Sequence, residues 1–207
     1  NFITKKDTNG VLIFQTNIQV FYGLAFDKIV DFTQHTDSSY YIISDSLLYH
    51  YSKSGMLVSR INTGLNTLKS IITLNNGNLL LSGKLANTQK ILEITTTASI
   101  VTQQNINSVF AKLIQTPGGS IYGLSSANRL VKLNSNLTVS SISSVGIAPN
   151  FSIRDFMYKN DSLFMTGVEI TSNTPFYMIS DQNFNILYQT PTSTYKNIIP
   201  NGTLIKK

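Results

Sequence analysis

The amino-acid sequence predicts an all-β fold built from a repeated unit of four antiparallel strands. A turn between two apolar runs recurs along the chain, apolar and polar residues alternate within those runs, and helical spacing is nowhere sustained. The clearest turns place Gly77, Gly119, Asp161 and Gly202 at one position of the repeat, with separations of 42, 42 and 41 residues. A repeat of about 40 residues made only of strands is typical of a β-propeller blade.

Each repeat contains two hairpins. In the first, apolar strands flank a turn, as in 68–74 and 79–84, and the second follows a short connector, as in 90–95 and 99–103. A weaker copy of the first turn, at 37–39, precedes the others. The turns are rich in Asn, Gly, Ser and Pro, which favour turn conformations. Four complete repeats can therefore be traced along the chain.

The two ends of the chain each match half of a repeat. Residues 2–13 fit the second hairpin, with Gly10 in its turn, and residues 195–207 fit the first. Pairing these halves in one sheet would close the ring and hide the sheet edges. We therefore expect one domain, 1–207, forming a five-bladed β-propeller of four-stranded antiparallel blades; the alternative is part of a propeller with six to eight blades. The expected blades span 195–207 with 1–17, 28–63, 67–104, 109–144 and 151–190.

The composition of the chain limits its possible partners and its possible location in or outside the cell. The hydrophobic content of 42% can supply a core, and the net charge of +6 is spread without a basic run among aromatics, so nucleic-acid binding is not expected. The chain has no cysteine, and no apolar run approaches the roughly 20 residues of a spanning helix, so direct membrane insertion is not expected. Abundant Asn, Ser, Thr and Gln suit an extracellular β-protein, although a bias of the source genome would produce them too.

One hairpin carries a resemblance to known proteins. Residues 48–58 read Leu-Tyr-x-Tyr-x-x-x-Gly-x-Leu-Val, and residues 117–122 supply the turn and strand that precede such a hairpin. This pattern resembles the propeller repeats of bacterial secreted and cell-surface proteins, and it extends over essentially the whole chain. The chain has no Trp, so it lacks the Trp-Asp signature of one large propeller class. The resemblance implies a propeller fold and export, and it carries over no catalytic residue.

Loops at one end of the channel are the usual binding sites of propellers. Residues 18–28 and 169–175 form the longest or richest of these loops, and exposed aromatics beside amides suit a sugar or protein ligand. The alternative for the aromatics of 18–28 is that they cap the core. The candidate binding residues are Phe21, Tyr22, Phe26, Asp45, Asn87, Asn128, Glu169 and Asn173.

The first strands of the blades supply a second set, polar in all five copies. Side chains at one level would ring the channel, where water or an ion can satisfy them. Hard cations prefer six or more oxygens, so two carboxylates among neutral and basic groups make a poor metal site, and we expect no metal or cofactor. The predicted channel ring is Asp31, Ser70, Lys112, Asp155 and Asn197.

Catalysis has few candidates in this sequence. Glycosidases need two carboxyl groups about 5 to 10 Å apart, and only Asp31 and Asp155 lie on matching first strands, with short connectors around them. The two imidazoles, His35 and His50, are expected on strand surfaces away from the channel mouth, which excludes a His-based triad or zinc site. We expect a protein that is not an enzyme.

The sequence therefore favours a non-catalytic binding or scaffolding module of an exported bacterial protein. A protein-interaction subunit of a cell-surface or outer-membrane assembly is the first expectation, a lectin-like or adhesive glycan-binding module the alternative, and a glycoside hydrolase the third. A lectin should have near-identical pockets between blades, whereas the loops at 45–46 and 169–175 differ in length and composition. The expected location is secreted, at the cell surface or on the periplasmic side of the outer membrane, with any membrane association through a partner.

Overall fold

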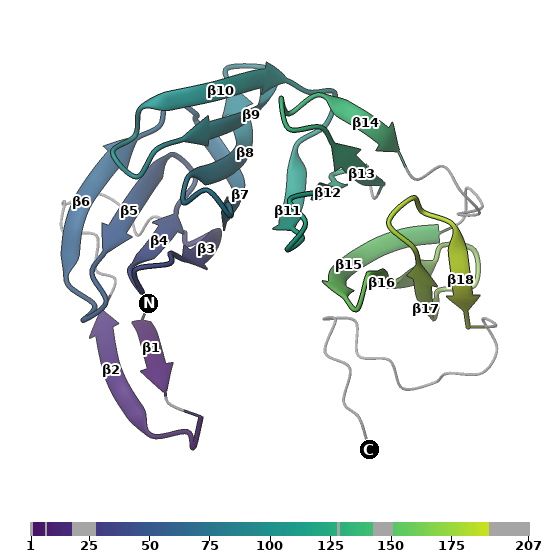
Figure 1. Cartoon of the computed structure of the whole chain (residues 1–207), viewed down its shortest axis with the longest axis horizontal. Helices are drawn as coiled ribbons and strands as arrows, with labels where there is room; N and C mark the ends of the chain where they lie inside the picture. The colour runs from purple at the N-terminus through teal and green to yellow at the C-terminus, as the bar shows by residue number, and fades with distance from the viewer. Residues whose placement is uncertain (1, 7, 18–27, 128, 143–150, 191–207) are drawn as a thin grey trace. The chain divides into compact units, whose positions relative to one another are not determined.

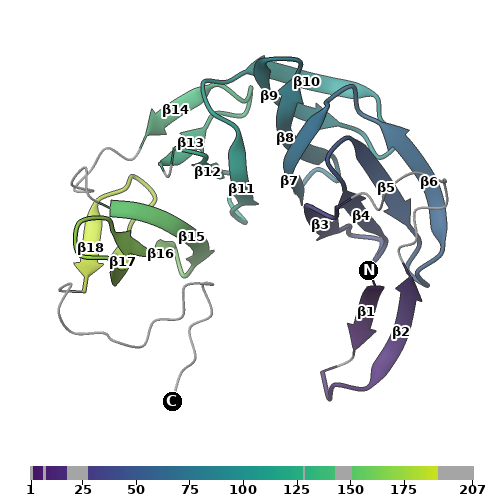
Figure 2. The same cartoon turned by 180° about the vertical axis from the view of Figure 1, so that it is seen from behind.

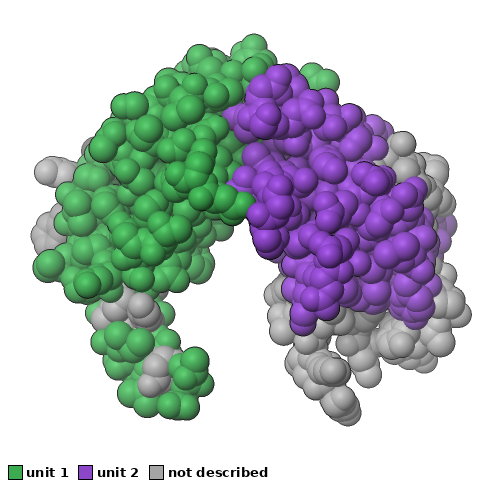
Figure 3. Space-filling model, viewed as in Figure 1, with its two compact units in different colours: residues 1–109 green, residues 110–207 purple. Residues whose placement is uncertain are grey.

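The computed structural model describes residues 2–6, 8–17, 28–127, 129–142 and 151–190 (Figure 1). The regular structure of these residues is β-strand throughout, arranged as four sheets of four antiparallel strands and one sheet of two strands. The chain divides into two compact units, Asn1–Val109 and Phe110–Lys207, which Figure 3 colours separately. Within the described ranges, no helix has the length and apolar character that crossing a bilayer requires.

Unit 1 contains the two-stranded sheet and two four-stranded sheets. In each four-stranded sheet, strands that follow one another in sequence are neighbours, so both sheets are simple meanders. The strands are β1 (Phe2–Lys6), β2 (Leu12–Asn17), β3 (Asp31–Gln34), β4 (Tyr40–Ile43), β5 (Leu47–Tyr51), β6 (Leu57–Asn62), β7 (Thr67–Thr73), β8 (Leu79–Leu85), β9 (Thr88–Ile94) and β10 (Ile100–Asn105).

Unit 2 contains two further four-stranded meanders, which Figure 2 shows from behind. Their strands are β11 (Phe110–Gln115), β12 (Ile121–Ser125), β13 (Leu130–Leu133), β14 (Val139–Ile142), β15 (Phe151–Lys159), β16 (Ser162–Glu169), β17 (Thr174–Ser180) and β18 (Ile186–Gln189).

Burial along the strands follows their place in the sheet. Every residue of β4 and of β12 is buried, because a middle strand packs against neighbours on both of its faces. The fourth strands β6 and β10 have the same pattern, two exposed residues and then an alternation of half-buried and exposed ones. The strands that the alternating apolar pattern predicts therefore lie in sheets whose two faces are both covered.

The turns of the first hairpins lie where the sequence predicts them. Gly77 and Gly119 adopt φ of 83° and 86°, a left-handed conformation that costs glycine little. Around Gly77, the Leu74 amide donates to the Asn78 carbonyl at 2.8 Å, and the Gly77 amide donates to the Leu74 carbonyl at 2.9 Å. The predicted turn at 160–161 also has positive φ, at 50° and 57°.

The second hairpins share one turn geometry but different residues at its left-handed position. Gly55, Ala98, Leu137 and Phe184 have φ of 83°, 69°, 64° and 66°. A branched or aromatic residue pays a steric cost there, yet the side chains of Leu137 and Phe184 are only 0% and 3% exposed. Burial of about 1.5 to 3 kcal/mol for such a side chain offsets the strain.

The β1–β2 sheet has the geometry of a second hairpin. Its register shifts between Lys5 and Lys6, as the β5–β6 register shifts between His50 and Tyr51, and Gly10 takes the left-handed turn position with φ 81°. Residues 2–17 therefore form a hairpin with the features of a second hairpin, and their pairing with another hairpin in one blade stays a prediction.

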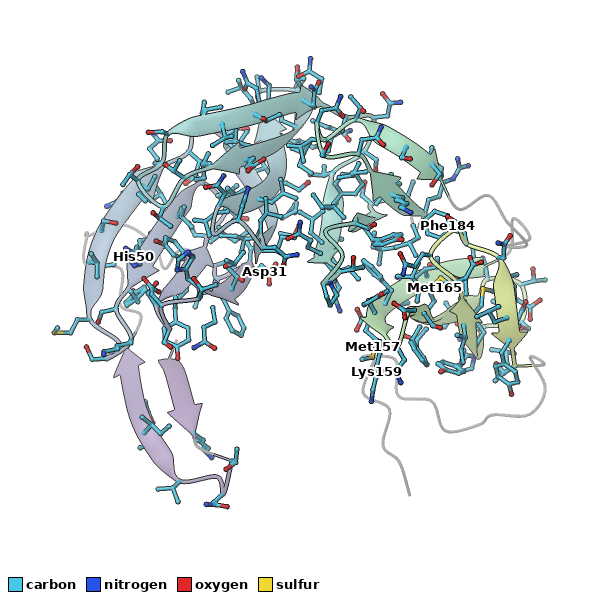
Figure 4. The ribbon with its side chains drawn as sticks, in the orientation of Figure 1. Asp31, His50, Met157, Lys159, Met165 and Phe184 are labelled. Carbon is cyan, nitrogen blue, oxygen red and sulfur yellow. The ribbon has the colours of Figure 1, made fainter. Side chains whose placement is uncertain are left out.

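Each unit has an apolar core between its two four-stranded sheets. In unit 1 the core includes Tyr41 and Leu48 from one sheet and Leu68 and Leu81 from the next. In unit 2 the cluster joins Tyr122 to the sheet β15–β18, from which Met165 and Phe184 contribute (Figure 4). Packing of consecutive sheets face to face is how propeller blades bury their apolar surfaces.

The predicted fold class is thus confirmed as an all-β chain of four-stranded antiparallel sheets. Closure through residues 195–207 lies outside the described residues. The number of five blades and the single domain therefore stay predictions.

Candidate functional site at the loop end of the sheets

Each four-stranded sheet has two different ends. Both hairpin turns lie at one end, which we call the turn end. At the other, which we call the loop end, the first strand begins and the second strand connects to the third; the connections 44–46, 86–87, 126–129 and 170–173 lie there. Those predicted ring and binding residues that the structure describes fall at the loop end: Asp31, Ser70, Lys112, Asp155, Asp45, Asn87, Glu169 and Asn173.

A β-bulge fixes the ring position in three sheets. The pairing register shifts between Leu68 and Ser70, between Phe110 and Lys112, and between Ile153 and Asp155. In these three sheets, the predicted ring residue therefore directly follows the extra residue of a bulge, whereas Asp31 pairs with Ile43 in a sheet whose β3–β4 register has no shift. Bulges re-aim side chains at the ends of sheets, and their recurrence at this position supports the sequence alignment of these residues.

In unit 1 the ring residue Asp31, labelled in Figure 4, connects two sheets. Its Oδ1 accepts a hydrogen bond from the Phe32 amide at 2.9 Å, and its Oδ2 accepts one from the Ile71 amide at 3.0 Å. Ile71 lies on β7, the edge strand of its sheet, where an amide needs an acceptor from outside the ladder. The Asp31 carboxylate supplies that acceptor across the junction.

Two more residues continue this junction towards the turn end. The Thr73 amide donates to Thr33 Oγ1 at 3.1 Å, and the His35 ring faces the Gly77 carbonyl with Nε2 at 3.0 Å. We call this row of contacts between β3 and β7 the unit 1 seam. In these contacts, side chains of the earlier strand bond to backbone groups of the later one, and the Thr73 hydroxyl in turn donates to the Gln34 carbonyl at 3.2 Å.

In unit 2 the same position forms an ion pair. Lys112 Nζ lies 2.5 Å from Asp155 Oδ1, which also accepts the Phe156 amide at 2.8 Å. The ammonium group lies 5.8 Å from the centre of the Phe156 ring, within cation–π range. We call these contacts between β11 and β15 the unit 2 seam.

Neighbouring copies of the ring position meet in pairs, and the ring itself stays a prediction. Asp31 contacts the strand of Ser70, and Lys112 contacts Asp155, so neighbouring copies of the position meet within each unit. The Ser70 side chain is fully buried, and among the described residues its Oγ has no hydrogen-bond partner. Asn197 lies outside the described residues.

The predicted loop residues fall into three groups. Asp45, Asn87 and Asn173 are exposed, and Asn173 has φ 53° in the β16–β17 loop. Glu169 is half-buried and accepts a hydrogen bond from the Ser172 hydroxyl at 2.6 Å, which orders that loop. Outside the described part of the chain lie Phe21, Tyr22, Phe26 and Asn128. All of these binding assignments stay predictions.

Sequence reasoning missed two aliphatic residues at the loop end. Leu85 closes β8 with 45% of its surface exposed, and Ile170 follows β16 with 62% exposed. Exposed apolar side chains beside polar loop residues are typical of interaction surfaces. In the sequence, both residues could have been recognised as an apolar residue just beyond the apolar run that forms a second strand.

The structure corrects the prediction that both histidines are strand-surface residues. The His35 side chain is only 12% exposed, and the His50 ring stacks on Tyr41 with centroids 4.5 Å apart. His35 meets the same tyrosine edge-on at 5.9 Å. Register explains the stacking, because Tyr41 and His50 are directly paired on neighbouring strands.

Burial dominates the electrostatics of this aromatic group. It lowers the pKa of His50 and raises that of Tyr41. The pKa of Asp37 falls to about 2, mainly because Ser39 lies against its carboxylate, with the Ser39 amide donating to Oδ1 at 2.8 Å. In the described part of the chain, no three His, Asp or Glu side chains gather as a metal site would require.

At the level of sequence, no family model and no curated protein matches this chain. Solved structures do match. The H270A virginiamycin B lyase of Staphylococcus aureus, solved with quinupristin, aligns with TM-score 0.69 and 13% identity over 97% of this chain and 64% of the lyase. The WD40 β-propeller domain of Doa1 aligns with TM-score 0.60 and 12% identity over 83% of this chain and 56% of that domain.

A third match is the extracellular domain of a bacterial protein. The extracellular domain of the putative one-component system BT4673 of Bacteroides thetaiotaomicron aligns with TM-score 0.58 and 14% identity over 79% of this chain and 24% of that protein. At these identities the likeness shows the fold alone, which is that of β-propeller proteins. The chain spans less than two thirds of the length of each of these three proteins.

Proposed function

We propose that this protein is a non-catalytic binding module that holds a protein partner on the loop end of its sheets. The module would belong to an exported bacterial protein, as a subunit of a cell-surface or outer-membrane assembly. Two structural neighbours support this proposal. The WD40 domain of Doa1 is consistent with protein interaction, and the extracellular domain of BT4673 is consistent with export.

One observation carries the proposal: the second-hairpin turns of the sheets are alike, and the loop ends differ. The second-hairpin turns share a single geometry, with hydrogen bonds of 2.8 to 3.1 Å at equivalent positions. By contrast, the second-to-third-strand connection has two residues at 86–87 and four at 170–173. A rigid frame with divergent loops suits one asymmetric protein interface better than repeated glycan pockets.

The carboxylates at the ring position support a binding role over hydrolysis. The oxygens of Asp31 accept two backbone amides, and Asp155 is held by Lys112 and by the Phe156 amide. A glycosidase needs one of its two carboxyl groups protonated beside the leaving group. The Asp31 and Asp155 carboxylates are engaged by other groups of the chain, which suits residues that hold sheets together.

The test is capture of native partners with matched surface variants. The loop-end variant is Asn87→Glu/Ile170→Glu, and the control is Ser135→Glu/Asn183→Glu, whose residues are also exposed but lie in turns. Each tagged protein is incubated with membrane and culture fractions of the source organism, and bound proteins are identified by mass spectrometry.

We expect the wild type and the control to retain the same partner and the loop-end variant to lose it. Retention of the partner by the loop-end variant would contradict the proposed face. Recovery of the wild type alone from every fraction would contradict a protein-binding function. Turnover of a polysaccharide that disappears in Asp155→Asn would favour the glycosidase instead.

A further inference from the structure

The sheet β7–β10 has an uneven charge distribution. Its 39 positions, 67–105, include three lysines and one carboxylate. Lys69 is the extra residue of the β7 bulge, Lys84 is the second-to-last residue of β8, and Lys90 lies opposite Gly83 near the start of β9. All three lysines therefore lie at the loop end of this sheet.

The single carboxylate of the sheet lies towards the opposite end and is already occupied. Glu93 is 7% exposed, and its Oε1 accepts hydrogen bonds from the side-chain amides of Asn76 at 3.0 Å and Asn78 at 2.7 Å. Both asparagines belong to the first-hairpin turn of the same sheet. Glu93 therefore does not neutralise the lysines.

The ammonium groups of these lysines are available to a partner. Lys69 is exposed and Lys84 and Lys90 are half-buried, and within the described ranges no carboxylate lies within ion-pair distance of any of them. Lys90 Nζ donates a weak hydrogen bond to Gln103 Oε1 at 3.4 Å. Uncompensated lysines on one end of a sheet attract acidic groups.

An apolar side chain lies at the same end of the sheet as the lysines. Leu85 follows Lys84 directly and is 45% exposed, and the β8–β9 turn that it enters places Ala86 at φ 51° and leaves Asn87 exposed. The tight turn holds these groups on a rigid hairpin, which lowers the entropy lost on binding. Because paired residues share a face, Leu85 and Lys90 lie on one face of the sheet and Lys84 on the other, so a segment that crosses the end of the sheet can reach all of them.

We infer that the loop end of sheet β7–β10 binds an acidic segment of a partner protein that also carries an apolar residue. This inference rests on the proposed function and names the chemistry of the partner. Carboxylates of the segment pair with Lys69, Lys84 and Lys90, while its apolar residue packs on Leu85. The charge pairs set the partner's orientation and its rate of association more than its affinity.

A peptide with pairs of glutamates separated by leucines, labelled with fluorescein, tests this by fluorescence anisotropy. The variant Lys69→Gln/Lys84→Gln/Lys90→Gln is compared with the control Lys6→Gln/Lys53→Gln/Lys159→Gln, which has the same net charge but exposed lysines at or beside turns. Since exposed ion pairs contribute modestly, we expect about tenfold weaker binding for the first variant and no change for the control.

Several results would overturn the inference. Absence of wild-type binding, equal losses in both triple variants, or equal binding of the same peptide with glutamine in place of glutamate would each do so. Tighter binding of a single-stranded DNA of matched length through the same lysines would assign the surface to a nucleic acid instead. Unchanged affinity in Leu85→Ser would overturn the apolar contact.

Capture of native partners separates this inference from the proposed function. If the lysine variant retains the partners that the wild type captures, the proposed function stands and the acidic segment is wrong. If the wild type captures none, the proposed function fails whatever the peptide does. Thermal unfolding of both triple variants verifies that loss of binding is not loss of folding.

Discussion

Within each unit, side chains at the same position of the repeat connect the two four-stranded sheets. The kind of contact that they make differs between the units. In the unit 1 seam, the Asp31 carboxylate bridges two backbone amides, one in its own strand and one in β7. In the unit 2 seam, the Asp155 carboxylate binds the amide of its own strand and the ammonium group of Lys112. The unit 1 seam thus depends on hydrogen bonds from backbone amides, and the unit 2 seam includes an ion pair between side chains.

The difference follows from which residue each sheet contributes. Ser70 brings no carboxylate to its position, so the neighbouring Ile71 amide takes its acceptor from the preceding sheet. Asp155 provides an acceptor for its own neighbour Phe156, so the preceding sheet can contribute a cation instead. The unpaired amide of a first strand must be satisfied in both cases, and only the source of the acceptor changes.

The largest expected effect concerns the bulge that both seams share. Gly83 and Gly167 lie opposite the bulge of their sheets. A Cβ on Gly83 would lie 2.6 Å from the Thr67 carbonyl oxygen, and one on Gly167 would overlap the equivalent carbonyl of Ser152 and the Phe176 ring. We expect Gly167→Ala to lower the free energy of unfolding by about 3 kcal/mol, measured by urea denaturation.

Gly118→Ala serves as the control for this prediction. Its Cβ would meet only the Thr116 hydroxyl at 3.9 Å, so the substitution should be nearly neutral. If Gly167→Ala were as stable as Gly118→Ala, the close approach at the bulge would not constrain the repeat.

A smaller loss is expected at the unit 1 seam. Asp31→Ala removes the acceptors of the Phe32 and Ile71 amides, and such hydrogen bonds to a charged group contribute about 2 kcal/mol. Amide hydrogen exchange measured by NMR should show faster exchange of Ile71 in this variant and unchanged exchange in Lys112→Ala. Equal protection of Ile71 in wild type and Asp31→Ala would contradict the backbone-directed seam.

The unit 2 seam should be weaker and sensitive to salt. The side chains of Lys112 and Asp155 are 41% and 31% exposed, so solvent screens their attraction. A double-mutant cycle with Lys112→Ala and Asp155→Ala should give a coupling energy of about 0.5 kcal/mol that declines at high salt. A coupling that ignores salt would show that packing on Phe156, rather than charge, joins these strands.

The smallest expected effect is a pH dependence confined to unit 1. Burial lowers the pKa of His50 below its ordinary 6.5. As the pH falls below 6.5, the unfolded chain binds a proton that the folded protein does not, so stability is lost on acidification and is fully present above that pH. Denaturation curves at neutral and mildly acidic pH should show this loss in the wild type and a reduced loss in His50→Phe.

The parts of the fold that local chemistry dictates could be predicted from sequence. Turn glycines such as Gly77 and Gly119 and the alternation within strands identify the repeat because both act over a few residues. The pairing of Lys112 with Asp155 could not be predicted, since equal positions in successive copies do not reveal which side chain spans the junction. The contact of both histidines with Tyr41 was missed because it depends on strand register.

The residue after the ring position is buried in two sheets and exposed in another. Ile71 and Phe156, which directly follow ring residues, are each 2% exposed because the preceding sheet packs on them. Phe32 occupies the same position after Asp31 but is 65% exposed. Before β3 the described chain contributes only the β1–β2 hairpin, which corresponds to third and fourth strands. We predict that residues 195–207 form a first hairpin that packs on Phe32.

The most direct test of the propeller account is a disulfide between the two ends of the chain. Alignment with the sheet β11–β14 predicts that Lys206 pairs with Thr4, and the chain has no cysteine of its own to interfere. We predict that Thr4→Cys/Lys206→Cys forms an intramolecular disulfide on mild oxidation, because paired strand residues lie within disulfide reach, whereas Thr4→Cys/Lys53→Cys does not. Free thiols or cross-linked dimers in the first variant would contradict a ring closed by its own ends and favour a propeller with more blades.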